Sequence, residues 1–317
     1  MIPFVILLAF VYAVVIGAND AANSFGNWVG ARIGKVIIGM LLCGLFAIFG
    51  AVAEGHKVTK TIGSGIIPSS YLTAEMAAIG IIGAILWVAI VTYFGLPISA
   101  THSVVGGIAG LGLAMAAPVN WLVLKKIVIC WLATPTASCL IAYLTFSFVL
   151  FIIKKLKIHK EFSKLSKYLI TVSSCYVAYT WGANDVGNAV ALISTAKVLP
   201  LKLSLFIGGV GICIGVVLFG SKVAITVGCN ITRITPTMGV CSDIATAMVV
   251  HFFTQLKIPV STTHALVGAI VGLGLVRGAR IVNFKIIRDI VFAWVITPVV
   301  SGLISFCVYH IFRICKG

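Results

Sequence analysis

The chain has 317 residues, of which 61% are hydrophobic and only 9% are charged. This balance lies far outside the range of soluble globular proteins and is typical of a polytopic helical membrane protein embedded in a lipid bilayer. The formal net charge of +16 would suit a nucleic-acid-binding protein. We do not favour nucleic acid as a partner, because the basic residues gather in connectors between apolar stretches, as in loops at an anionic cytoplasmic surface.

Each half of the chain divides into about five apolar stretches. Those of the first half cover roughly residues 2–31, 34–53, 72–94, 97–117 and 120–153. Those of the second half cover roughly residues 168–196, 203–228, 239–256, 258–276 and 284–312. A helix of about 20 apolar residues crosses the hydrocarbon core of a bilayer. We therefore predict an all-α, multi-pass protein of the cell membrane.

Two motifs occur once in each half. Gly-Ala-Asn-Asp-Ala-Ala-Asn at 17–23 returns as Gly-Ala-Asn-Asp-Val-Gly-Asn at 182–188. Leu-Pro-Ile-Ser-Ala-Thr-His at 96–102 returns as Ile-Pro-Val-Ser-Thr-Thr-His at 258–264. The halves are therefore homologous.

The repeat predicts the domain organisation: a first repeat over 1–153, a basic connector over 154–167 and a second repeat over 168–317. Because five is odd, the second repeat enters the membrane from the opposite face if all five stretches cross. This is an inverted-topology repeat, with re-entrant or broken helices expected to meet near the bilayer midplane.

The basic residues predict an orientation. Alternate connectors hold more Lys and Arg than the others: those around 32, 95, 154–167, 230 and 277–288. Positive loops stay on the cytoplasmic side. We therefore expect the 154–167 connector in the cytoplasm and both termini outside.

Two carboxylates stand inside apolar stretches, where a charge is costly and needs a reason. Asp20 lies twelve positions before Arg32, and Asp185 twelve before Lys197, on the order of 18 Å along a helix. Both should lie near mid-membrane. We expect the neighbouring glycines to unwind the helix and free carbonyl oxygens, which with the carboxylates and amides suit Na⁺ or a titrating proton.

The candidate cation ligands are Asp20, Asn19, Asn23, Asp185, Asn184 and Asn188. The same residues have a purely structural interpretation, in which Asn and Asp join helices by hydrogen bonds. Equivalent clusters in both halves favour function, because packing alone seldom needs an ionisable group at this depth.

The second motif has the pattern of a helix start. Proline leads, hydroxyls stand at the cap, and a Gly-rich run behind them allows close helix packing. The free N–H groups and the positive dipole end of such a helix attract anions. Two such ends would form a site for a tetrahedral oxyanion, and its candidate residues are Ser99, Ala100, Thr101, Ser261, Thr262 and Thr263. The alternative is that the hydroxyls only cap their helices.

Four further residues are secondary candidates: His102, His264, Glu75 and Asp243. The histidines suit anion binding or proton shuttling, and equally a hydrogen-bonding role that fixes the hairpin, which we favour. Glu75 and Asp243 precede the hairpin motifs by similar distances and suit either coupling-ion binding or an interfacial position.

The paired GAND-x-x-N and P-x-S-x-T-H motifs resemble those of the inorganic phosphate transporter (PiT) family over essentially the whole chain. The resemblance implies an inverted-repeat fold with re-entrant hairpins and cation-coupled phosphate transport. It also implies that Asp20, Asn23, Asp185 and Asn188 serve both cation and phosphate, while the hairpin starts hold the anion.

Two features depart from the family. Ala100 stands where the second repeat has Thr262, so the first hairpin lacks one hydroxyl, and the central connector is short. The first departure costs one contact, and the second indicates a minimal, prokaryotic version.

Three other functions compete with a phosphate symporter. A sulfate permease ranks second, because sulfate carries no proton to donate to the carboxylates. A passive anion channel would be indifferent to cation gradients. An intramembrane hydrolase built on Ser99 with His102, or Ser261 with His264, lacks a third orienting group.

We therefore expect no enzymatic activity and no cofactor. The expected partners are inorganic phosphate and a transported cation, Na⁺ ahead of H⁺, with a second copy of the chain as a candidate homodimer. The sequence leaves open whether a metal-phosphate complex is the substrate.

Overall fold

The computed structural model describes residues 1–225, 234–278 and 283–316, and over these residues it is helical without strands. The first half contains α1 (Ile2–Gly30), α2 (Val36–Glu54), α3 (His56–Ser64), a 3-10 turn (Ser69–Tyr71), α4 (Ala74–Tyr93), α5 (Ala100–Ala114) and α6 (Trp121–Leu156). The second half contains α7 (His159–Thr195), α8 (Leu201–Phe219), α9 (Ser221–Ile225), α10 (Pro236–Gln255), α11 (Thr262–Arg277) and α12 (Phe284–Lys316).

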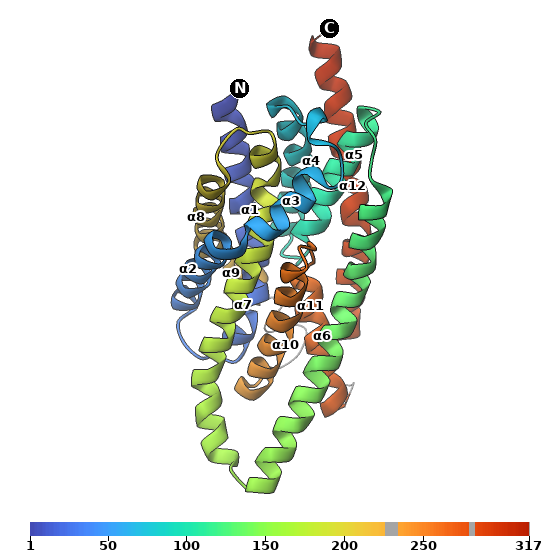
Figure 1. Cartoon of the computed structure of the whole chain (residues 1–317). Coiled ribbons are helices and arrows are strands. Elements are labelled where there is room, and N and C mark those ends of the chain that lie inside the picture. Colours follow the sequence, from blue (N-terminus) through green and yellow to red (C-terminus); the bar gives the residue numbers. More distant parts are fainter. Residues whose placement is uncertain (226–233, 279–282, 317) are drawn as a thin grey trace.

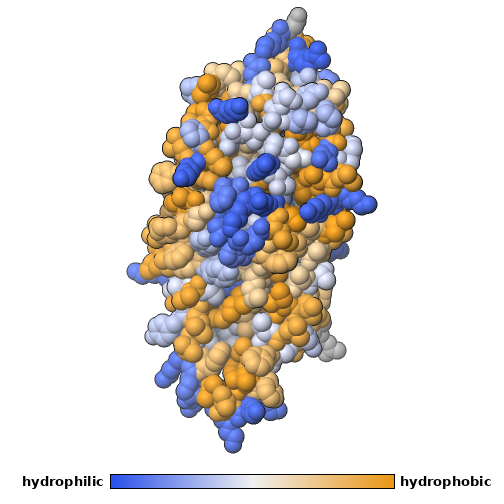
Figure 2. Space-filling view, viewed as in Figure 1, coloured by the Kyte–Doolittle hydropathy of each residue, from blue (hydrophilic) through white to orange (hydrophobic). Residues whose placement is uncertain are grey.

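Seven of the described helices are long and apolar enough to cross a membrane, and α5 and α11 are shorter apolar helices. Hydrophobic residues cover most of the face drawn in Figure 2, while hydrophilic ones gather at its two ends and in a patch at its middle. The predicted class, an all-α multi-pass membrane protein, is confirmed. Parts of the predicted basic connectors, around 230 and at 279–282, lie outside the described residues.

The 154–167 connector consists largely of helix ends. α6 continues to Leu156 and α7 begins at His159. The turn between them is short, with Lys157 in the left-handed region at φ 58°. The basic residues of the connector therefore lie on a helical elbow at one end of the molecule, drawn at the bottom of Figure 1.

The two halves pack across each other. α1 descends from the N-terminus in Figure 1, whereas α7 rises from the elbow at the opposite end. α1 packs against α8 and α7 against α2, while α5 packs against α12 and α11 against α6. Each half therefore provides the packing partners of the other.

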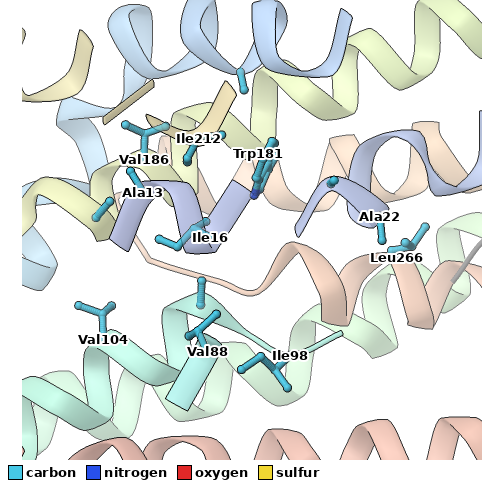
Figure 3. Packing of buried hydrophobic residues seen from close by; sticks show 14 of the residues in the cluster. Ala13, Ile16, Ala22, Val88, Ile98, Val104, Trp181, Val186, Ile212 and Leu266 are labelled. Carbon is cyan, nitrogen blue, oxygen red and sulfur yellow. The ribbon is translucent and has the colours of Figure 1, made fainter. Parts of the chain in front are cut away.

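Two helical hairpins project into this arrangement, α4–α5 from the first half and α10–α11 from the second. Closely packed apolar side chains support them. Figure 3 shows Ile16 and Ala22 of α1, Ile98 of the first hairpin turn and Leu266 of α11 within one buried cluster. The hairpin turns are therefore held in the core of the molecule.

The expected unwinding around the two Asp residues is wrong. α1 and α7 are regular helices through residues 17–23 and 182–188. Instead, the glycines allow close packing: a Cβ at Gly17 would lie 2.1 Å from the Ile212 carbonyl oxygen, and one at Gly182 would lie 2.1 Å from that of Ala47. Glycine is needed here because a neighbouring backbone approaches too closely for any side chain.

Candidate functional site

Both hairpins begin their second helix with a serine cap, as the sequence predicted. Ser99 Oγ accepts a hydrogen bond from the backbone N–H of His102 at 3.2 Å, and Ser261 Oγ accepts one from that of His264 at 3.3 Å. The first N–H groups of a helix have no acceptor within the helix. The ends of α5 and α11 therefore provide donors suited to an anion.

The two hairpin turns contact each other through their threonines. Thr101 Oγ1 lies 3.0 Å from the Val260 carbonyl oxygen, and Thr263 Oγ1 lies 3.0 Å from that of Ile98. Each turn thus donates a hydroxyl to the backbone of the other. The hydroxyl-bearing starts of α5 and α11 come together, as the sequence predicted.

The acidic cluster of α7 contacts both hairpins. Asp185 Oδ1 lies 3.1 Å from Thr101 Oγ1 and 2.7 Å from Asn188 Nδ2, and Asp185 Oδ2 accepts from Thr262 Oγ1 at 2.9 Å. Asn188 Nδ2 also donates to Thr101 at 2.9 Å. Since Thr101 has one hydroxyl proton for both Asp185 and Val260, its donor is shared.

The cluster of α1 repeats this pattern with fewer contacts. Asn23 Nδ2 donates to Thr263 Oγ1 at 3.0 Å, and that hydroxyl lies 3.5 Å from Asp20 Oδ1. Ala100 stands at the position of Thr262, so the first hairpin has no second hydroxyl to donate. Asp20 therefore has weaker hydrogen-bond support than Asp185, which is the cost that the sequence indicated.

The remaining two asparagines hold the hairpins in place. Asn19 Nδ2 donates to Thr92 Oγ1 and to the Leu96 carbonyl, and Asn19 Oδ1 accepts from the N–H of Ile98. Asn184 Nδ2 donates to Thr254 Oγ1 at 3.0 Å. Sequence analysis did not select the two threonines.

Thr92 and Thr254 stand at equivalent positions of the two halves. The alignment of the two repeats is therefore the signal that could have identified these two threonines.

The two histidines fix the hairpins to long helices. The His102 ring lies against Trp131 with ring centroids 3.6 Å apart and a tilt of 31°, and His264 stacks on Trp294 at 3.7 Å. His102 Nδ1 lies 3.1 Å from the Trp294 carbonyl oxygen, and His264 Nδ1 lies 3.0 Å from that of Trp131. These contacts agree with the preferred positioning role. The serine hydroxyls meet the histidine backbone and not the imidazoles, which disfavours a Ser/His hydrolase.

The structure separates Glu75 from the other candidates. Glu75 lies in the first turn of α4, where both its carboxylate oxygens are 2.9 Å from Lys316 Nζ. The hairpin turn follows the other end of that helix, roughly 27 Å further on at 1.5 Å per residue. The expectation that Glu75 is a coupling-ion ligand is therefore not supported by its position.

Asp243 lies in a separate buried polar cluster. Its Oδ1 accepts from Asn27 Nδ2 of α1 at 2.7 Å, and its Oδ2 accepts from Ser173 and Ser174 of α7 at 2.8 and 2.7 Å. It stands twelve residues before the end of α10, on the order of 18 Å from the hairpin turn. The hydrogen bonds of Asp243 thus join α10 to α1 and α7, the two helices that carry the acidic clusters.

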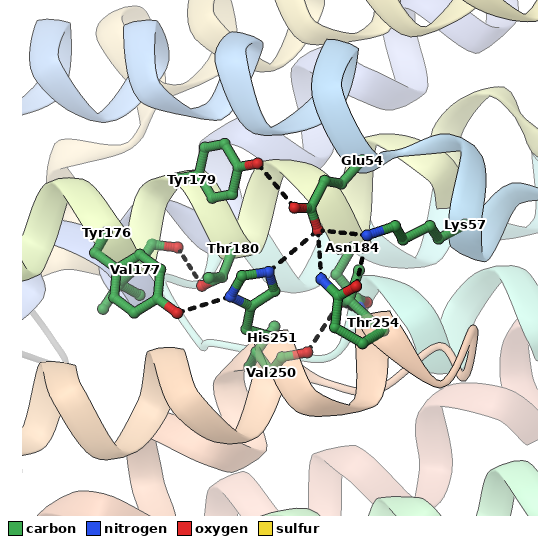
Figure 4. A network of polar contacts seen from close by, with 11 residues as sticks. Glu54, Lys57, Tyr176, Val177, Tyr179, Thr180, Asn184, Val250, His251 and Thr254 are labelled. Atoms are coloured by element: carbon green, nitrogen blue, oxygen red, sulfur yellow. Dashed lines mark hydrogen bonds and ion pairs between the residues drawn. The ribbon is translucent and has the colours of Figure 1, made fainter.

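A further polar network lies beside the central site and was missed from sequence. Figure 4 shows Glu54, at the end of α2, between Tyr179, His251 and Lys57. Glu54 Oε1 accepts from Tyr179 at 3.0 Å, and Glu54 Oε2 lies 3.1 Å from His251 Nε2 and 3.2 Å from Lys57 Nζ. Glu54 has no acidic counterpart in the second half, where Phe219 precedes the matching glycine, so the repeat gave no signal for it.

The central site is a buried set of oxygen atoms. The two carboxylates, four asparagines and five hydroxyls are each at most 2% exposed: Asp20, Asp185, Asn19, Asn23, Asn184, Asn188, Ser99, Thr101, Ser261, Thr262 and Thr263. The Oδ1 atoms of Asn23, Asn184 and Asn188 are buried without a partner. Buried polar atoms are normally satisfied, and carboxylate and amide oxygens are ligands for hard cations.

These features define a multi-pass helical membrane protein with two facing hairpin ends and a buried set of oxygen atoms between them. A family model described as the phosphate transporter family matches residues 16–305. The chain belongs to the phosphate transporter family, whose function is phosphate transport.

Named relatives and one solved structure agree. The chain is 33% identical to a candidate phosphate permease of Pyrococcus furiosus, over 98% of this chain and 96% of that protein. It is 32% identical to one of Pyrococcus abyssi, over 96% of each. It also resembles the solved structure named the sodium-dependent phosphate transporter, with a TM-score of 0.91, 29% identity and 99% of both chains covered.

Proposed function

We propose that the protein imports inorganic phosphate by symport with a cation, Na⁺ ahead of H⁺, through alternating access. The observation that carries the proposal is the crossed contact between halves: Asp185 with Thr101, and Asp20 with Thr263. Each acidic cluster thereby lies against the anion-attracting end of the other half's hairpin. The Na⁺ preference rests on the similarity to a sodium-dependent transporter and on the oxygen ligands.

The cation sites in this proposal centre on the two acidic clusters. Asp20 supplies a carboxylate whose hydroxyl neighbour, Thr263 Oγ1, lies 3.5 Å away, and Asn23 supplies an unpartnered amide oxygen. Asp185 and Asn188 form the matching pair. A buried carboxylate needs a counter-charge, and Na⁺ provides one without requiring a basic side chain.

Phosphate in this proposal binds between the hairpin ends. The first N–H groups of α5 and α11 and the hydroxyls of Thr101, Thr262 and Thr263 provide its donors. Ala100 contributes only its backbone. Phosphate beside two carboxylates is repelled unless a cation arrives first, and this repulsion explains the coupling.

Asp243 extends the proposal to a third cation position, outside the two acidic clusters. Asn27 Oδ1, Ser242 Oγ and Thr246 Oγ1 are buried without a partner near it on α1 and α10. They would complete an oxygen shell around a cation at the Asp243 carboxylate. Asp243→Asn should then raise the Na⁺ concentration needed for half-maximal uptake.

The proposed transport cycle uses the inverted repeat. The central residues are buried from both ends of the molecule, so substrate release requires the hairpins to part from α1 and α7. Rocking of two related halves about such a site is the usual solution in secondary transporters. We place the elbow of α6 and α7 in the cytoplasm and both termini outside.

The test is uptake of labelled phosphate into proteoliposomes under an imposed Na⁺ gradient, a pH gradient or no gradient. Accumulation driven by Na⁺ supports the proposal, and accumulation driven by the pH gradient alone reassigns the carboxylates to protons. Excess unlabelled sulfate serves as a competitor. Uptake of sulfate in place of phosphate, or flux that ignores both gradients, contradicts a phosphate symporter.

A further inference from the structure

A basic cavity of about 360 Å³ opens beside the second hairpin. Its walls come from α3, from the first turns of α6 and from the turn between α10 and α11. Three lysines line it, one from each of these segments: Lys60, Lys126 and Lys257. The hydroxyl residues Thr61 and Ser64 also line it, and no lining residue is acidic.

The three ammonium groups are not neutralised by ion pairs within the described part of the chain. The neighbouring Lys57 differs, because it lies 3.2 Å from Glu54 and 2.6 Å from Gln255 Oε1. In Figure 2, hydrophilic residues form a patch in the middle of an otherwise largely hydrophobic face, at the height where α3 begins in Figure 1. Positive charges bordered by low-dielectric walls concentrate anions.

The cavity adjoins the central site along the chain. Ile258 lines the cavity, and Val260, two residues later, accepts the hydroxyl of Thr101 at 3.0 Å. The cap Ser261 stands three positions after Ile258, which is at most ~10 Å of extended chain. An anion held by the lysines is therefore next to the turn that holds the proposed phosphate site.

The corresponding positions of the other half carry no such charge. Aligning Thr92 with Thr254 places Gly95 opposite Lys257, and aligning Trp131 with Trp294 places Asp289 opposite Lys126. Asp289 is paired with Arg288 at 2.9 Å. Gly95 and Lys257 both have positive φ, 73° and 62°. This conformation favours glycine, which the first hairpin has, whereas the second hairpin has lysine at the same position.

We propose that this cavity is an antechamber for an oxyanion, which binds free inorganic phosphate before it enters the central site. The proposal rests on the proposed transport function. Lys126 lies near the end of α6 opposite the elbow, so with the elbow in the cytoplasm the antechamber faces outward. It gives the importer a capture site on its entry side only. A phospholipid headgroup presents the same chemistry and must be distinguished.

The first experiment measures binding without transport. Ser64→Cys places a thiol in the cavity, and mass spectrometry follows its modification by anionic and cationic methanethiosulfonates in vesicles of phosphatidylcholine. We expect the anionic reagent to react about tenfold faster and inorganic phosphate to slow it. The combined variant Lys60→Gln, Lys126→Gln and Lys257→Gly should remove both effects.

The second experiment measures transport. Lys126→Gln and Lys257→Gly should each raise the KM for phosphate about threefold at low ionic strength, with unchanged maximal rate, and the difference should shrink in high salt. Lys125→Gln is the matched control, because Lys125 lines a different, apolar cavity. A KM equal to that of the control in both variants would overturn the proposal.

Two further arms separate the alternatives. Protection of position 64 by phosphatidylglycerol vesicles, but not by inorganic phosphate, would overturn the free-phosphate antechamber and identify a lipid site. Protection by inorganic phosphate that persists with Asp20→Asn supports the antechamber independently of transport. If that protection persists while the unmodified protein fails to accumulate phosphate, the proposed transport function is contradicted and the anion site in the cavity is supported.

Discussion

The two acidic clusters have the same residues but different surroundings. Asp185 receives hydrogen bonds from Thr101, Asn188 and Thr262, whereas Asp20 has one hydroxyl, that of Thr263, at 3.5 Å. Part of this difference follows from Ala100, which stands where the second hairpin has Thr262 and therefore offers no second hydroxyl. A motif that occurs in both halves therefore need not give two equal sites. We infer that Asp20 depends more on a bound cation, while Asp185 is organised by the protein itself.

Removing the Asp20 charge should have the largest effect. Asp20→Asn should reduce Na⁺-coupled phosphate uptake about a hundredfold, because the least supported carboxylate loses the charge that attracts the cation. Asp289→Asn is the control, since that carboxylate is half-exposed and paired with Arg288. If Asp20→Asn and the control take up phosphate at the same rate in proteoliposomes, the inference that Asp20 depends more on a bound cation is contradicted.

The two halves should respond alike where their packing is alike. Gly17→Ala and Gly182→Ala each place a methyl group 2.1 Å from a carbonyl oxygen of the other half, and we expect each to lower the free energy of unfolding by about 2 kcal/mol. Gly80→Ala is the control, because its nearest neighbour is a side-chain methyl of Leu192 at 3.0 Å. Thermal unfolding in detergent measures this, and a large difference between the first two variants would contradict the repeat.

Removing the hydroxyls of Thr101 and Thr263, which join the two hairpin turns, should weaken transport less than removing the Asp20 charge. Thr101→Val and Thr263→Val preserve shape but leave Asn188 and Asn23 without their hydroxyl acceptors, and we expect about a tenfold loss of uptake in each. Thr136→Val provides a control, because Thr136 bonds only within its own helix, to Leu132. Wild-type uptake rates in both variants would show that the contact between the hairpins is dispensable.

Restoring the missing hydroxyl should have the smallest and most specific effect. Ala100→Thr gives Asp20 the donor that Thr262 gives Asp185, and it should raise the half-saturating Na⁺ concentration about threefold. Ala100→Val has nearly the same shape without the hydroxyl, so the difference between the two variants isolates the hydrogen bond. An identical Na⁺ dependence of uptake in both would disprove this origin of the asymmetry.

Much of the fold was predictable because its signals are local and repeated. Apolar stretches located the long helices, and the recurrence of Ser99 as Ser261 located both caps. The backbone at Gly17 and Gly182 was predicted wrongly. The sequence suggested unwinding. Glycine is instead required because α8 and α2 approach these positions closely, and such a tertiary contact leaves no local sequence pattern.

The site was predictable to the extent that its residues repeat. The sequence indicated Asp20, Asp185 and the threonines, but not which cluster faces which hairpin, because that crossing depends on how the halves pack. The network of Glu54 with Tyr179 and His251 exists in one half only and joins residues more than 120 positions apart. Neither periodicity nor repeat alignment could reveal it.

The most direct test of the central claim is equilibrium binding of phosphate to the purified protein as a function of Na⁺ concentration. We predict that phosphate affinity rises with Na⁺ in the unmodified protein and becomes nearly independent of Na⁺ in Asp20→Asn. Phosphate affinity that ignores Na⁺ in the unmodified protein, or that rises equally in the variant, would contradict coupling through the Asp20 cluster.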